Sequence, residues 1–537
     1  MNIEDRNRGQ RLEELWTQYR RGVDFNTRIG LYDTVAANEN FYIGKQWEGV
    51  RAEGLPTPVF NFLKRVTLYL VSSVAADNLK LQASPMTATG LPLGEGERIC
   101  AAVNGQFESL LEHNKIGGLI REKLRESAVT GDGCIYTYFD PDAETGQVQK
   151  GEIRSEIVDN TRVLFGNPTD RRVEKQPYIM LVSRELTEGL RLRAKSLGAL
   201  DWRSIVPDAD ESRAFREPQD DDKTTVLLKL YRLPGGDKIW ATECTKTCVI
   251  RPPYNTGLRH YPITWLSWDY VKDCYHGQAA ITGLIPNQIF VNKLFAMAMI
   301  SLMTTAYPKI VYDKTRIAHW DARVGAAIGV NGGDMSEIAK IMDPAQVSPQ
   351  ISQFIELAVT YTQNFLGATD AALGNVRPDN TSAIIALQQA SGIPLETVKR
   401  NLHQCIEDLG RIYLDFMSNY YGLRLIELPD PLTGQPVTEL FDFGVLEQYP
   451  LSLKLDVGAS AYWSEIASIQ TLDNLLSQDK IALEDYLERL PDGYLSKKQA
   501  LIEKLRAEKA QMEPGTMDAA GMGMSTVPFD LPQEGVV

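Results

Sequence analysis

The chain has 537 residues, of which 43% are hydrophobic and 23% charged, so it has enough apolar side chains to build sizeable cores. Acidic residues outnumber basic ones by 70 to 56, which gives a formal net charge of −14. Proteins that grip nucleic acid through its phosphates usually carry a basic surface, so this balance argues against a high-affinity nucleic-acid binder. The six cysteines are scattered, which favours a reducing compartment over a disulfide framework.

The N-terminal region begins with a polar helical pattern over residues 3–22. It places Leu12, Leu15, Trp16 and Tyr19 on one side, and its arginines are interpreted as a solvated helix face. The segment is charged and has no apolar core, so we do not expect a signal peptide. A soluble intracellular product is the expectation.

The first half of the chain mixes helical and strand-like patterns. Helices are predicted over 61–79 and 97–129, with a turn rich in proline and glycine between them. The pattern then changes to short strands with turn residues between them, and these lie at 133–158, 163–168, 177–186, 224–233 and 238–250. The fold class predicted for this half is therefore α+β.

The middle of the chain is helical and nearly uncharged. Between residues 278 and 306 the only charge is Lys293, and residues 350–365 carry only Glu356. Helices that are apolar on most faces are buried on most faces, so neither is expected to stand alone in water. The insert between them, 307–349, is predicted to hold short strands, a turn and a short helix. The longest apolar stretch, 294–307, is too short for a bilayer span.

The last part begins with a run of turn-formers and small polar residues at 367–383. A helix then runs to about residue 420, with Gly392 and Pro394 expected to break or kink it near its start. Strands are predicted within 423–457 and helices from about residue 464 to beyond 496. The tail, 513–537, is rich in glycine, methionine and proline and is predicted to be disordered.

No catalytic constellation stands out in the sequence. There is no P-loop, no H-E-x-x-H and no G-x-S-x-G. Cys244 and Cys248 lack a second ligand pair for zinc, and the segment 140–146 lacks the spacing of a calcium loop, so no metal and no cofactor are predicted. Two hypotheses remain, namely an assembly protein whose uncharged helices bury against copies of itself, and an enzyme whose acids, such as Asp220–Asp222, converge only in the fold.

Five ordered stretches resemble the portal proteins of tailed bacteriophages. NENFYIGKQWEGV and GLPTPVFNFLKRVTLYLVSSV are similar to an N-terminal signature of the form FY-x-G-x-QW followed by P-x-x-N. YPITWLSWDYVKDCYHGQAAITGLIPNQIFVNKLFA resembles a strand, a Y-x-G turn and an LIP-x-Q-x-x-x-N start of the stem. NTSAIIALQQASGIPLETVKRNLHQCIEDLGRIY and LDVGASAYWSEIASIQTLDNLL resemble the helix after the tunnel loop and the link to the crown. Together these stretches span roughly residues 30–510.

The resemblance implies a portal fold with an α/β wing, a two-helix stem, a small α/β clip, a long kinked helix and a helical crown. The implied parts are the wing at 1–276 and 421–457, stem helices at 277–306 and 350–366, the clip at 307–349, the tunnel loop at 367–381, the kinked helix at 382–420, the crown at 458–512 and the tail at 513–537. The crown is shorter than in the family, so no long helical tube above it is expected.

The function implied by the resemblance is mechanical, without enzymatic turnover. Portal proteins form a ring, dodecameric in the virion, at one capsid vertex, through which double-stranded DNA is packaged and ejected. The implied partners are the terminase large subunit, then an adaptor or head-completion protein, together with the major capsid and scaffolding proteins, and no membrane. The implied location is the virion, and the host cytoplasm during assembly. The competing hypothesis is a monomeric nucleic-acid-processing enzyme.

Two groups of site residues follow from this resemblance. In the tunnel loop, the candidates for facing the DNA channel are Asp370, Asn375, Arg377, Asp379 and Asn380, of which Arg377 is the only cation. The alternative is an exposed turn in which Pro378 and Asp379 set the backbone and Asn380 or Thr381 caps the helix. In the clip, the candidates for docking terminase or adaptor are Lys314, Arg316, Trp320 and Arg323. Trp320 is either an interface anchor or a packing residue between clip subunits.

Overall fold

The computed structural model divides the chain into two compact units, Met1–Gly458 and Ala459–Val537. The residues that the structure describes are 3–51, 54–75, 79–85, 93–209, 222–306, 310–321, 323, 327–332, 334, 338–341, 350–365, 393–429, 436–449, 451–457, 469, 472–478, 480–490, 501–502 and 504. The mixture of helices and sheets in the first unit agrees with the predicted α+β class.

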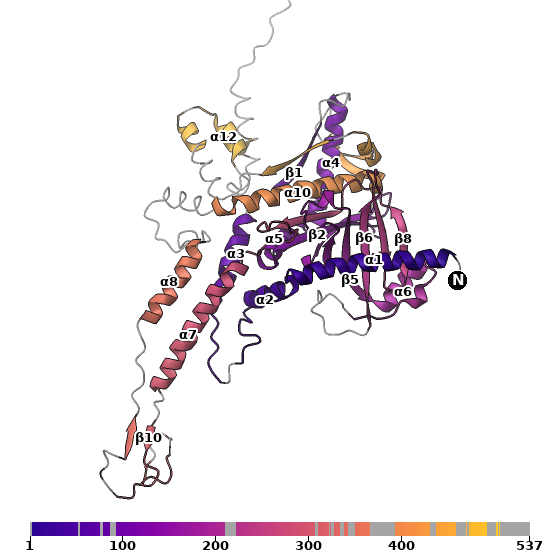
Figure 1. Ribbon diagram of the computed structural model, residues 1–537. Helices are drawn as coiled ribbons and strands as arrows, with labels where there is room; N and C mark the ends of the chain where they lie inside the picture. The colour runs from indigo at the N-terminus through magenta and orange to yellow at the C-terminus, as the bar shows by residue number, and fades with distance from the viewer. Residues whose placement is uncertain are drawn as a thin grey trace, which may run out of the picture. The chain divides into compact units, whose positions relative to one another are not determined.

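A long N-terminal helix covers one face of a five-stranded antiparallel sheet in the first unit (Figure 1). The helix α1 (Ile3–Arg28) buries Trp16 and Tyr19, as the apolar side of the predicted helix required. The Trp16 indole donates to the carbonyl of Thr245 at 3.0 Å, which fixes the helix on the sheet. The sheet has the order β4 (Val163–Phe165), β5 (Tyr178–Leu186), β6 (Lys223–Arg232), β7 (Ile239–Cys244) and β8 (Val249–Asn255), and α6 (Thr187–Ser196) follows β5.

A second, three-stranded sheet lies at the centre of the main hydrophobic core. Its order is β3 (Glu152–Val158), β2 (Asp132–Asp140) and β9 (Ile263–Ser267), and β2 and β3 form the hairpin predicted at 133–158. The predicted helix 97–129 is in fact two helices, α4 (Leu93–His113) and α5 (Ile116–Thr130). Lys115 separates them because its φ of 50° lies in the left-handed region, which an α-helix cannot contain.

One strand was missed by the sequence prediction. The helix expected over 61–79 is α3 (Phe62–Val74), and β1 (Leu79–Pro85) follows it. β1 pairs antiparallel with β14 (Leu451–Val457), with Leu79 opposite Val457 and Pro85 opposite Leu451. The partner lies about 370 residues away, so no local window of sequence reveals the pairing.

The long helix α10 (Glu396–Phe416) crosses this core (Figure 1). The side chains expected on its apolar face are all buried, namely Val398, Leu402, Ile406, Leu409, Tyr413 and Phe416. A 3₁₀ turn, Ile393–Leu395, precedes it, and one π-helical turn, Met417–Tyr421, ends it. The hairpin β12 (Leu423–Pro429) and β13 (Pro436–Asp442) follows. The part of the predicted kinked helix before residue 393 lies outside the described residues.

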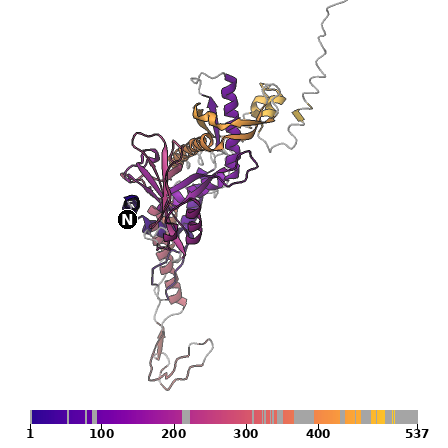
Figure 2. The same ribbon diagram turned by 90° about the vertical axis from the view of Figure 1, so that its right-hand side faces the viewer.

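Two helices project from the first unit side by side (Figures 1 and 2). They are α7 (Ile285–Ala306) and α8 (Gln350–Phe365). They correspond to the two nearly uncharged helices predicted from the sequence, but α7 begins at Ile285 and not at Gly277, because the segment before it forms a turn and the 3₁₀ turn Thr282–Leu284. Asn287 Nδ2 donates to Thr362 Oγ1 at 3.1 Å, which fixes their antiparallel register. Between them, β10 (Ile310–Tyr312) and β11 (Ala339–Ile341) form a small antiparallel pair, as predicted for the insert.

The second unit is helical where the structure describes it. Its helix α12 (Leu483–Arg489) buries Leu487, and Leu490 is buried just after the helix. The Tyr486 hydroxyl donates to Asp473 Oδ1 at 2.6 Å, which ties α12 to the preceding segment. The predicted disordered tail, 513–537, lies outside the described residues.

Candidate functional site at the root of the stem helices

The segment between α2 (Leu31–Ile43) and α3 is closed at its base by side-chain hydrogen bonds, and we call its described residues, 44–51 and 54–61, the arm. Trp47 Nε1 donates to the carbonyl of Pro58 at 2.9 Å, and Asn61 Nδ2 donates to the carbonyl of Tyr42 at 2.9 Å. Asn61 Oδ1 also accepts from the Lys64 amide, so it caps α3. Gly44 begins the arm at a φ of 94°, which favours glycine. The first sequence signature is therefore a loop-closing device.

This arm is bonded to the first turns of α7 through three buried amides. Asn292 Nδ2 donates to Gln46 Oε1 at 2.6 Å, and Gln288 Nε2 donates to Asn292 Oδ1 at 3.0 Å and to the carbonyl of Phe60 at 2.7 Å. All three amide side chains are almost completely buried, where each lost hydrogen bond is expensive. Phe60 also stacks on Phe295 with ring centroids 3.8 Å apart. The signatures at residues 41–61 and 284–292 thus meet in space.

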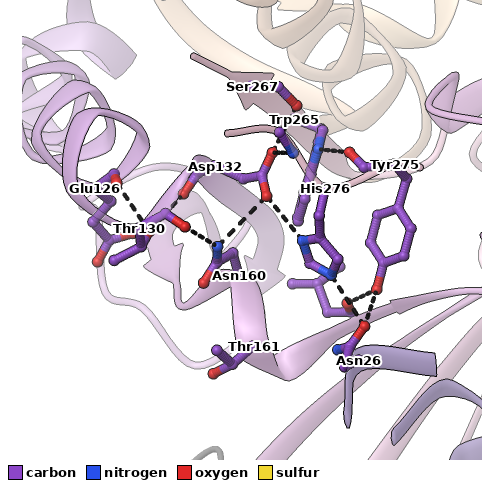
Figure 3. Close-up of polar contacts among 12 residues, drawn as sticks. Asn26, Glu126, Thr130, Asp132, Asn160, Thr161, Trp265, Ser267, Tyr275 and His276 are labelled. Atoms are coloured by element: carbon purple, nitrogen blue, oxygen red, sulfur yellow. Dashed lines mark hydrogen bonds and ion pairs between the residues drawn. The ribbon is translucent and has the colours of Figure 1, made fainter. Parts of the chain in front are cut away.

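The turn that leads into α7 is held by a second network, centred on the carboxylate of Asp132 (Figure 3). His276 Nδ1 donates to Asp132 Oδ2 at 2.8 Å, and the Gly277 amide and the Ser267 hydroxyl donate to Oδ1 at 2.8 and 2.6 Å. His276 Nε2 lies 3.2 Å from Asn26 Oδ1, which comes from α1. The network is buried, so the carboxylate depends on these partners for its solvation.

Two glycines allow the backbone at this turn to pack closely. A Cβ on Gly277 would lie 2.6 Å from the carbonyl oxygen of Asp269 and 2.7 Å from Ser267 Cβ. A Cβ on Gly131 would lie 2.6 Å from the Gly277 carbonyl oxygen, and the φ of Gly131 is 109°. Gly277 is the glycine of the Y-x-G signature, and the lack of room for a Cβ explains why a glycine stands there. Its tyrosine, Tyr275, donates from its hydroxyl to the carbonyl of Val163 at 3.0 Å.

A third contact joins α2 to the segment just before α7, and we call the residues joined by these three sets of contacts the root. Asn38 Nδ2 donates to the carbonyl of Val129 and to Thr282 Oγ1, both at 2.9 Å. On the neighbouring α5, Arg125 forms an ion pair with Glu39. Glu126 beside it is largely buried, and this burial, with the nearby charges of Asp159 and Glu122, raises its pKa to about 8. The root therefore contains a carboxyl group that is half-protonated near pH 8.

Below the root, α7 and α8 expose large apolar side chains. Leu302 on α7 is 59% exposed and Tyr361 on α8 is 65% exposed. The other exposed apolar side chains on the two helices are Ile289, Phe290, Met297, Met299, Met303, Phe354 and Leu357. Monomeric soluble proteins rarely leave so continuous an apolar surface uncovered.

One helix of the described chain, Thr282–Thr305, is long and apolar enough to cross a membrane by length and composition alone. The expectation based on the stretch 294–307 was therefore too narrow, because the helix begins well before it. The first half of this helix packs in the root, where Gln288 and Asn292 are buried against the arm.

The four residues predicted to dock terminase or adaptor lie in the segment between β10 and β11. Trp320 is half-buried and stacks on Tyr312 with ring centroids 5.2 Å apart, so part of its surface is used within its own subunit. Arg316 pairs with Asp313, and Arg323 pairs with Asp321 at 2.6 Å but stays 87% exposed. Lys314 is exposed.

The tunnel-loop candidates Asp370, Asn375, Arg377, Asp379 and Asn380 lie outside the described residues, as do Asp220 and Asp221 of the enzyme hypothesis. Asp222 is exposed, and its backbone carbonyl accepts hydrogen bonds from the amide and the hydroxyl of Thr187. Cys244 and Cys248 lie at the β7–β8 turn, and burial raises their pKa values to about 12 and about 11. In the part of the chain that the structure describes, no three histidine, cysteine or acidic side chains are placed to hold a metal ion.

Sequence reasoning missed several residues of the root, chiefly Asn26, Asn38 and Asp132. Each is a polar residue in a helix or at the start of a strand, where a solvated position is the usual interpretation. Only the quoted signatures pointed to this region, through Gln46, Gln288 and Asn292.

A comparison with protein families defines the class of protein. Part of the sequence matches a family of phage portal proteins, and this match supports a phage portal protein. The matching family is described as phage P22-like portal protein, and it covers residues 236–424, from β7 through the stem helices and α10 to β12. A comparison with curated proteins found no match. Portal proteins of this family are structural components and not enzymes.

Proposed function

We propose that the chain forms the homo-oligomeric ring at one capsid vertex, dodecameric in the virion, that serves as the conduit for packaging and ejecting the genome. The portal family implies an oligomeric ring associated with capsid and other phage proteins. The observation in this chain that best supports the proposal is the uncovered apolar surface of α7 and α8. Burial of apolar surface stabilises by about 25 cal/mol per Å², so a neighbouring subunit on these helices would stabilise the assembly considerably.

Neighbouring subunits explain the stem better than a lipid bilayer does. The first half of the apolar helix is fixed in the root by the amides of Gln288 and Asn292. Lys293 lies exposed near the middle of the helix, where a charge in hydrocarbon would cost about 3 kcal/mol. Copies of α7 and α8 in a ring would cover the apolar faces and leave Lys293 free to meet an opposite charge.

A glutamate in the stem tests this assignment. Leu302→Glu should place a charge in the proposed interface and shift the chain from rings to smaller species, as measured by mass photometry. The matched control is Leu200→Glu, because Leu200 is 74% exposed but lies on the wing, just after α6. Normal rings from Leu302→Glu would show that the stem does not form the subunit interface.

The channel is proposed to pass double-stranded DNA without holding it. The chain's excess of 14 acidic charges supports this, because DNA beside a mostly negative wall releases few counterions and is bound weakly. Binding of a DNA duplex to the assembled protein should accordingly be very weak and insensitive to salt. Tight binding that falls steeply between 50 and 200 mM salt would contradict the proposal.

The clip is proposed to dock the terminase large subunit and later an adaptor or head-completion protein, while the outer parts meet the major capsid and scaffolding proteins. Lys314 and Arg323 are the most exposed cations of the clip candidates. The variant with both Lys314→Glu and Arg323→Glu should weaken terminase binding about tenfold in a pull-down titration, because interfacial charge reversal introduces repulsion. Unchanged binding, with rings intact, would move the docking surface away from these two residues.

A further inference from the structure

The arm is a preformed loop. Its base is closed by the hydrogen bonds of Trp47 to Pro58 and of Asn61 to Tyr42, and Gln46 fixes it to α7. A loop held at several points loses little conformational entropy when something binds to it, which favours binding. In the first unit the arm lies beside the first half of α7, held there by the stack of Phe60 on Phe295 (Figure 1).

The free part of the arm exposes both apolar and charged side chains. Val50 and Leu55 are 56% and 58% exposed, and Val59 is also exposed. Glu48 and Arg51 are exposed, and within the described ranges neither forms an ion pair. Within its own subunit the arm is therefore held at its base, and the side chains beyond the base stay exposed.

The stem carries the complementary set. Its two helices have only two charges, Lys293 on α7 and Glu356 on α8. The hydrogen bond from Asn287 to Thr362 places Lys293 and Glu356 at about the same level along the two helices. The helices are antiparallel, Lys293 lies six residues after Asn287, and Glu356 lies six residues before Thr362. Both are exposed, and neither is ion-paired with any residue that the structure describes. The apolar side chains Phe354 and Leu357 on α8 flank Glu356.

We propose that the arm of one subunit docks on α7 and α8 of the next subunit, with Arg51 meeting Glu356, Glu48 meeting Lys293, and Val50 and Leu55 covering the apolar side chains of the neighbour's α8. A contact between the arm of one subunit and the helices α7 and α8 of the next is heterologous, as a closed ring requires. It rests on the proposed ring, and it assigns a specific partner surface to the arm. The arm carries one negative and one positive side chain, and so do the two helices. This complementarity favours a second copy of this chain as the occupant.

Charge reversal provides the first test. Arg51→Glu and Glu356→Arg should each lower the stability of the ring to dilution, raising the concentration at which it dissociates by about threefold to tenfold. The double variant, with both reversals, should return to within about threefold of the natural protein. Arg11→Glu is the matched control, since Arg11 is an exposed arginine on α1. Failure of the double variant to recover, with both single variants impaired, would overturn the pairing of Arg51 with Glu356.

Crosslinking provides the second test and separates this proposal from the ring itself. The variant with Leu55→Cys and Leu357→Cys, treated with a short bismaleimide, should give a ladder of covalently linked subunits on a denaturing gel. The natural protein is the control, because its described cysteines are buried or half-buried. Rings without the ladder would overturn the arm contact and leave the proposed ring standing, whereas monomers of the natural protein would overturn both.

Discussion

Asn292, two turns into α7, donates a hydrogen bond of 2.6 Å to Gln46 at the base of the arm, 246 residues earlier in the chain. Both side chains are buried, and Gln288 extends the contact to the backbone of Phe60. Helix α7 is therefore joined to the rest of the first unit by side-chain hydrogen bonds as well as by the chain itself. Its root is bonded to the arm and, through His276 and Asp132, to the central sheet.

Removal of the Asn292 amide should weaken this connection measurably. Asn292→Ala leaves Gln46 Oε1 buried without its donor and removes an acceptor of Gln288, which should lower the free energy of unfolding by about 1–3 kcal/mol. Urea unfolding followed by tryptophan fluorescence measures it, and Trp47 reports on the arm. Asn287→Ala is the control, since Asn287 is exposed and Thr362 Oγ1 keeps its hydrogen bond to the Ala358 carbonyl, so the loss should be less than about 1 kcal/mol. Equal losses for the two variants would show that the buried contact has no special role.

Gly277 should not tolerate a methyl group. Gly277→Ala would place Cβ 2.6 Å from the Asp269 carbonyl oxygen, so the turn into α7 must shift, at a cost of about 2–3 kcal/mol. Gly283→Ala is the matched control, because nothing lies within 4 Å of its added Cβ. Thermal melting of both variants measures the difference. A normal melting temperature for Gly277→Ala would contradict the packing described for this turn.

The buried carboxyl of Glu126 should make stability depend on pH. Its pKa rises from 4.5 in the unfolded chain to about 8 in the folded one, because burial and nearby acids disfavour the charge. The contribution of Glu126 to the free energy of unfolding is therefore fully present below pH 4.5 and is lost as pH rises through 8. Glu126→Gln should be more stable than the natural protein at pH 9, by up to about 4 kcal/mol, and nearly equal to it at pH 4.5. Urea unfolding at the two pH values measures this, and a difference that does not vary with pH would contradict it.

The segment containing Arg377 is proposed to act on DNA after the ring has formed. Deletion of residues 372–379 should leave ring assembly unchanged and impair packaging or DNA retention in an infection assay. Arg377→Ala alone should reproduce part of the defect if its charge meets phosphate. Loss of rings on deletion would instead assign the segment a structural role.

Much of the fold could be predicted where the signal is local. The burial of Trp16 and Tyr19, the hairpin at 133–158 and the buried face of α10 all follow from hydrophobic periods of 2 and 3.6 residues. The two nearly uncharged helices were recognised from composition, because a helix that is apolar on most faces is usually buried on most faces.

What could not be predicted depends on residues far apart in the chain. The strand β1 was missed because its partner β14 lies near the end of the first unit. Asp132 and Asn26 gave no signal, since a single carboxylate or amide has the same appearance in a sequence whether it is solvated or holds four backbone segments together. The resemblance found Gln46 and Asn292 as separate signatures, and only the fold shows that they are one contact.

We propose that further copies of this chain cover the exposed apolar surface of α7 and α8. Negative-stain electron microscopy of the purified natural protein tests it most directly. The predicted result is a population of rings with a central hole, built from copies related by rotation about one axis. Compact monomers at micromolar concentration, with no rings, would contradict the account.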